Sequence, residues 1–147
     1  MMTSTRLHYG LMGLMLAACL AVPGPALAEM ISFTAQLKGS SEVPPNDSNG
    51  AGAVTATYDT ATKKFGWKGD YSGLSGAATM AHFHGPADPS KNAAVIVPIT
   101  PSTSPFEGSA TLTDAQAAEL TAGQWYVNVH TAAHPGGEIR GQVVKGK

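Results

Sequence analysis

The chain has 147 residues, of which 9 are basic and 10 are acidic, giving a formal net charge of −1. This length fits one domain, and the absence of a basic cluster argues against a nucleic-acid partner. The one cysteine, Cys19, has no second cysteine with which to form a disulfide in the chain.

The first 28 residues have the pattern of a secretory signal peptide. A positively charged start precedes a nearly all-apolar run, residues 7–22, and residues 26–28 (Ala-Leu-Ala) form a small-x-small cleavage site. Removal of residues 1–28 would leave residues 29–147 as a single mature domain that is periplasmic or secreted. The alternative is a lipoprotein signal, in which a lipidated Cys19 anchors the protein. The apolar run of residues 7–22 is too short for a secure membrane span. We also expect no transmembrane segment in the mature chain.

Apolar and polar residues alternate along much of the mature chain, as in β-strands that bury one face. We predict strands over residues 31–37, 51–58, 63–71, 79–84, 94–99, 106–112, 125–131 and 138–144. The polar stretch 39–52 is predicted to be a loop without helix. Thr113 and Gln116 match a capping box, which predicts one short helix over residues 114–122. The count favours an all-β fold of seven to eight strands, either an immunoglobulin-like or Greek-key β-sandwich or a barrel.

Four histidines of the mature chain fall in two segments, His82 and His84 in one and His130 and His134 in the other. Residues two apart in a strand share a face, so His82 and His84 could reach one ion, and neutral imidazole suits copper and zinc. His130, on the corresponding face of a later strand, is the predicted third ligand. Met80 and His134 are secondary candidates, and a Met80 thioether would favour copper. The alternative is that these histidines hydrogen-bond loop backbone and only brace the fold.

The strand faces without histidine are apolar. We therefore predict that four residues on these faces are buried in the core: Phe83, Val127, Val129 and Ile139.

Two charged residues near the C-terminus, Glu138 and Arg140, share a strand face by the same alternation. Arg140 is predicted to bond to a carboxylate, either that of Glu138 or that of Glu42. The same two carboxylates are candidates to hold the second ring nitrogen of a histidine ligand.

Four longer motifs resemble one known family. They are residues 42–45 (Glu-Val-Pro-Pro), 81–86 (Ala-His-Phe-His-Gly-Pro), 126–131 (Tyr-Val-Asn-Val-His-Thr) and 135–142 (Pro-Gly-Gly-Glu-Ile-Arg-Gly-Gln). Together they are similar to the CHRD domain, a module named after chordin and also found singly in bacterial exported proteins. The resemblance covers nearly the whole mature chain and implies an extracytoplasmic β-rich domain. The sequence departs from it at His134, where the family more often has Asn.

These observations favour a non-enzymatic binding module with a histidine-based copper or zinc site, whose loops contact a protein or surface partner. The mature chain has no cysteine to act as a nucleophile, and no Gly-x-Ser-x-Gly motif marks a serine hydrolase. One alternative is a metal-dependent oxidoreductase, because copper/zinc superoxide dismutases also carry a His-x-His strand on a β-barrel. The other is a purely structural or protein-interaction module without a metal.

Overall fold

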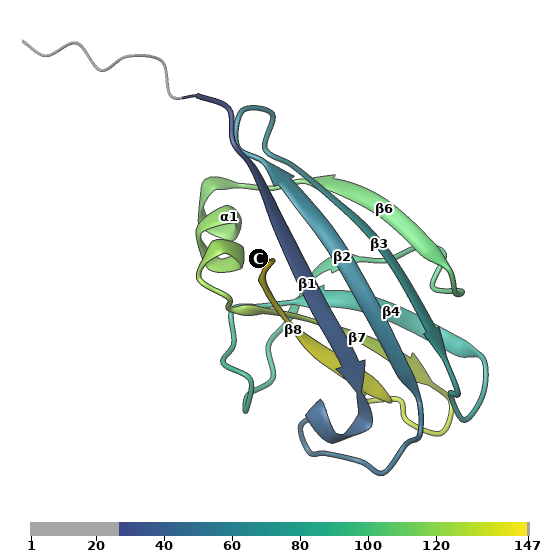
Figure 1. Cartoon of the computed structure of the whole chain (residues 1–147). Helices are drawn as coiled ribbons and strands as arrows, with labels where there is room; N and C mark the ends of the chain where they lie inside the picture. The colour runs from purple at the N-terminus through teal and green to yellow at the C-terminus, as the bar shows by residue number, and fades with distance from the viewer. Residues whose placement is uncertain (1–26, 147) are drawn as a thin grey trace, which may run out of the picture.

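The computed structural model describes residues 27–146, and eight antiparallel strands form its one sheet. The strands are β1 (Met30–Lys38), β2 (Ala51–Asp59), β3 (Lys64–Ser72), β4 (Ala78–His84), β5 (Val95–Pro98), β6 (Phe106–Thr111), β7 (Trp125–Thr131) and β8 (Ile139–Lys145). Their order is β5-β4-β7-β8-β1-β2-β3-β6, and the sheet curls into a nearly closed barrel (Figure 1). The predicted all-β class is confirmed. The predicted signal peptide lies, except for its last two residues, outside the described residues.

Each strand end falls within one residue of its prediction. One loop differs, because Gly39–Ser41 form a turn of 3-10 helix where no helix was predicted. Two backbone N–H groups, those of Glu42 and Asn46, donate to the Gly39 carbonyl oxygen at 3.0 and 3.1 Å. Glycine at this position leaves room for the Asn46 side chain to fold against the turn. A short turn closed in this way is too local to give a periodic signal.

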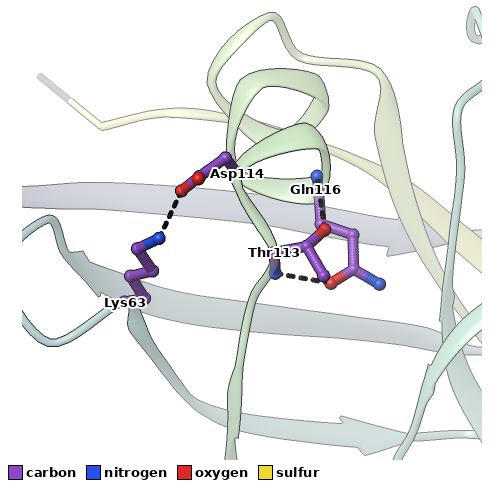
Figure 2. Close-up of polar contacts among 4 residues, drawn as sticks. All are labelled: Lys63, Thr113, Asp114 and Gln116. Atoms are coloured by element: carbon purple, nitrogen blue, oxygen red, sulfur yellow. Dashed lines mark hydrogen bonds and ion pairs between the residues drawn. The ribbon is translucent and has the colours of Figure 1, made fainter.

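The helix α1 (Asp114–Thr121) begins at the predicted capping box. The Gln116 N–H donates to Thr113 Oγ1 at 3.2 Å, and the Thr113 N–H donates to Gln116 Oε1 at 2.9 Å (Figure 2). Asp114, in the first turn, forms an ion pair with Lys63 Nζ at 2.6 Å. A carboxylate at this position also favours the positive end of the helix dipole. In the described part of the chain, no helix has the length and apolar character that crossing a membrane requires.

The apolar core forms where the curled sheet closes on itself. The rings of Phe65 and Trp67, on β3, each lie 5.2 Å from the ring of Phe83 on β4, in edge-to-face contact. These strands lie in opposite halves of the sheet order, so their contact shows that the two halves share one core. The predicted core residues are confirmed, with no exposed surface on any of the four: Phe83, Val127, Val129 and Ile139.

The strand β7 lies between β4 and β8 (Figure 1). Every residue of β7 is buried, so both of its faces are covered. Its inner face meets the apolar core. Its outer face is covered by loops, which bond to the neighbouring side chains on β8. We call the covered outer side chains of these three strands the polar layer: His82, His84, Tyr126, Asn128, His130 and Arg140. The histidine-bearing faces therefore turn away from the core, as predicted, yet mostly do not meet solvent.

Candidate metal centre

Three histidines of the polar layer converge on one point. His82 and His84 project from β4 and His130 from the adjacent β7, because the pairing of these strands sets His82 opposite Asn128. One ring nitrogen of each histidine lies within 4.8 Å of the others. The structure thus brings together the three residues that the sequence suggested as metal ligands.

Two of the rings are held from outside by backbone carbonyls. His84 Nδ1 lies 3.0 Å from the Ala93 oxygen, and His130 Nδ1 lies 2.9 Å from the Pro135 oxygen. A carbonyl oxygen can only accept, so each Nδ1 carries a proton and donates it. In a neutral ring of this tautomer, Nε2 keeps a free lone pair, as a metal ligand requires. Both Nε2 atoms point inward to the convergence point.

An amide oxygen lies between these two nitrogens. Asn128 Oδ1 is 2.9 Å from His84 Nε2 and 3.0 Å from His130 Nε2. The fourth atom, His82 Nδ1, is 3.3 Å from His130 Nε2. With both rings neutral, the Asn128 oxygen and the two Nε2 atoms are three acceptors facing one another, and a proton on His82 Nδ1 could satisfy only one of them, His130 Nε2. A bound cation would stabilise this arrangement. By strand alternation Asn128 shares a face with His130, yet nothing in the sequence marked it as part of the site.

Burial favours the neutral form of His82 and His84. Burial lowers the pKa of His82, and its neighbours His130 and His84 lower it further. Burial also lowers the pKa of His84, although the Ala93 carbonyl and the Asn128 oxygen, which accept hydrogen bonds from the protonated ring, act in the opposite direction. A lowered pKa keeps the lone pairs available at neutral pH, because protons compete with a metal for them.

A stack of three side chains supports the ring of His84. The rings of His84 and Tyr126 are parallel within 2°, with centroids 4.7 Å apart. The guanidinium carbon of Arg140 lies 3.5 Å from the centre of the same tyrosine ring, in a cation–π contact. Arg140 is itself fixed, because it donates to Asn92 Oδ1 at 2.9 Å and to the Lys91 oxygen at 2.7 Å. The loop over the polar layer therefore sets the orientation of this ring.

The family model for the CHRD domain matches residues 33–143. The chain belongs to the CHRD domain family. The match confirms the resemblance seen in the motifs, and it includes all three converging histidines and Asn128. Searches of curated proteins and of solved structures returned no match.

The buried Glu138 of this CHRD domain does not pair with Arg140, contrary to prediction. Its carboxylate accepts hydrogen bonds from Ser48 Oγ, from the N–H and Oγ of Ser75, and from Thr131 Oγ1. Burial raises the pKa of Glu138, but these hydrogen bonds outweigh it and lower the pKa to about 2. Glu138 precedes β8, and the turn there directs its carboxylate to these donors instead of along the strand face.

Glu42 is also buried but has fewer partners. Burial raises its pKa to about 7, although the charge of Arg140 and hydrogen bonds from Asn128 and the Val43 backbone lower it. Its Oε1 atom has no hydrogen-bond partner among the described residues. The predicted bond from Arg140 to Glu42 is wrong, because the loop residues Asn92 and Lys91 occupy the guanidinium.

The sequence suggested that Glu42 or Glu138 holds the second ring nitrogen of a histidine ligand. In the structure neither carboxylate does so. Backbone carbonyls that loops bring over the polar layer take that role.

The two secondary candidates differ in position. His134 lies in the turn after β7, where its N–H and carbonyl bond to Thr131, and it is not among the converging histidines. Met80 lies on β4 in register with His130, two residues before His82, and 46% of its surface is exposed.

Proposed function

We propose that this CHRD domain is an exported binding module in which His82, His84 and His130 hold one copper or zinc ion. The observation that carries the proposal is the group of facing acceptors. A nitrogen ligand lies about 2.0–2.1 Å from zinc, so nitrogens sharing one ion lie roughly 3–4 Å apart. The 3.3 Å between His82 Nδ1 and His130 Nε2 is in this range. The signal-peptide pattern of residues 1–28 supports export.

A purely bracing role explains less of the geometry. A brace needs one bonded nitrogen per ring, and the carbonyl oxygens of Ala93 and Pro135 already supply that bond for His84 and His130. The second nitrogen of each ring could then face solvent or a donor. Both face the Asn128 oxygen instead, and a proton on His82 Nδ1 could reach only one of them, His130 Nε2, in a buried place where unpaired acceptors are costly. A metal ion accounts for this arrangement, and the carbonyls then fix the tautomer of its ligands.

Each residue of the site would have a distinct part in binding. His84 and His130 offer Nε2 and His82 offers Nδ1, while the Asn128 oxygen lies beside two of these atoms. Three histidines leave a fourth position on a tetrahedral ion for water or another ligand. When bound, copper or zinc would supply a Lewis acid at the outer surface of β4.

Calorimetric titration of the purified, metal-free protein with copper and with zinc tests the proposal. We expect one ion per chain, and a double variant, His82→Ala with His84→Ala, should lose more than about 100-fold in affinity, since loss of a single outer-shell partner already costs 10–100-fold. His134→Ala is the matched control, because it removes a histidine outside the convergence point, and its affinity should equal that of the parent. If neither metal binds, or if the double variant binds as tightly as the parent, the histidines are braces for the fold.

A further inference from the structure

The three converging histidines are not held equally. His84 and His130 are buried and fixed by carbonyl oxygens, whereas His82 is only partly buried. The one hydrogen-bond partner of the His82 ring in the described chain is His130. The site therefore has a fixed side under the loops and a free side at His82.

Met80 lies on this free side. It is two residues before His82 on the same face of β4, and the sheet register sets it opposite His130. The β-carbons of residues directly opposite one another lie about 4.5–5.5 Å apart, which is within reach of a flexible methionine. The pairing of β4 with β7 is irregular between Ala78 and Met80, and such irregularities redirect side chains.

The free side opens to solvent. Met80 and His82 line one surface hollow of about 310 Å³, whose other wall is the segment 98–103. Met80 is one of few large apolar side chains with substantial exposure in the described chain, and it borders a polar site instead of packing into the core. A thioether at this place contributes little to the fold but lies where a ligand could meet an ion.

We propose that Met80 supplies a thioether ligand to a cuprous ion held by the three histidines, which makes the centre selective for Cu(I). This inference rests on the metal site proposed above and names its metal. A thioether is a soft donor that prefers Cu(I), whereas zinc is well served by imidazole alone.

The test compares the affinities of Met80→Leu for two metals. Leucine keeps most of the apolar volume and removes only the sulfur. Cuprous ion is supplied anaerobically from a competing chelator, and zinc is titrated in parallel into the purified, metal-free protein. Cu(I) affinity should fall about tenfold or more, while zinc affinity stays within about twofold. Met30→Leu is the matched control, since Met30 is 61% exposed at the start of β1, and it should match the parent for both metals.

X-ray absorption gives a second readout, because copper–sulfur scattering should appear in the Cu(I)-loaded parent and disappear in Met80→Leu. If the parent binds both metals and Met80→Leu binds Cu(I) as tightly as Met30→Leu does, the thioether role is wrong and the histidine site stands. An equal loss of Cu(I) and zinc affinity in Met80→Leu would also overturn it, since that result indicates a structural role. A parent that binds neither metal overturns the metal site itself.

Discussion

The strands β4 and β7 separate two buried regions of opposite chemistry. On the inner side, Phe83 and Val127 have no exposed surface and belong to the apolar core, where Phe83 packs against the ring of Phe65. On the outer side, Asn128 and His130 are almost as buried, at 2% and 6% exposure, but loops cover them and their contacts are directional. Apolar contacts tolerate small displacements, whereas each buried polar atom needs a partner. At the candidate metal centre the neutral rings alone do not meet this need, because the Nε2 atoms of His84 and His130 face the Asn128 oxygen, which also accepts.

The largest expected effect comes from placing a charge in the inner region. Val127→Asp should destabilise the fold by about 4 kcal/mol or more, because an unpaired carboxylate in an apolar core has no compensating partner. Val144→Asp makes the same change on β8 at a side chain that is 48% exposed, and it should alter stability by no more than about 0.5 kcal/mol. Chemical denaturation of both variants measures the difference. A Val127→Asp protein that unfolds at nearly the denaturant concentration of the parent would mean that the two faces are assigned in reverse.

The two buried glutamates have different surroundings, which shift their pKa values in opposite directions. The pKa of Glu138 falls from 4.5 to about 2, so its contribution to stability is present above pH 4.5 and lost as the pH falls through 2. The pKa of Glu42 rises from 4.5 to about 7, so its contribution is present below pH 4.5 and lost as the pH rises through 7.

Substitution of each glutamate by glutamine should therefore give changes of opposite sign at about pH 8 in the metal-free protein. Glu138→Gln should be less stable than the parent. Glu42→Gln should be more stable by about 1–2 kcal/mol, which is less than the full shift implies because water screens part of the site. The gain for Glu42→Gln should shrink as the pH is lowered to about 5, which denaturation at both pH values measures. Changes of the same sign in the two variants would contradict this account of their surroundings.

Strand alternation in the sequence was sufficient to place the inner region. A period of two put Phe83 in the core and His82 and His84 together on the other face, and the capping residues Thr113 and Gln116 marked the start of the helix. These features depend on neighbours within a few residues, which is why local patterns reveal them.

The cover over the outer region could not be predicted in this way. The carbonyls that hold His84 and His130 belong to loops nine and five residues away, and Arg140 finds its partners Asn92 and Lys91 almost fifty residues earlier in the chain. Such contacts depend on where the curled sheet brings the loops, and alternation carries no information about that. The pairing of opposite charges, which suggested a bond between Arg140 and a glutamate, also ignores donors such as serine and threonine hydroxyls.

The smallest loss of stability is expected from removing one exposed hydrogen bond, the one that caps the start of α1. Thr113→Ala removes the hydroxyl that accepts from the Gln116 N–H at the start of α1, and it should cost about 1 kcal/mol of stability. Thr113→Ser keeps the hydroxyl and should retain most of that stability. Thermal denaturation of the pair measures the cap alone. If the alanine and serine variants were equally stable, the cap would contribute nothing to the fold.

The burial of β7 on both faces has a consequence for how the sheet assembles. A shift of its pairing by one residue would exchange the two faces, moving Asn128 and His130 among the aromatic rings and Val127 and Val129 among the polar loops. Neither region accepts the other's side chains, so the strand has one energetically acceptable alignment with β4 and β8. The three histidines converge only in a chain whose central strands are correctly paired. A metal ion bound at the proposed site would therefore stabilise that chain relative to misaligned ones.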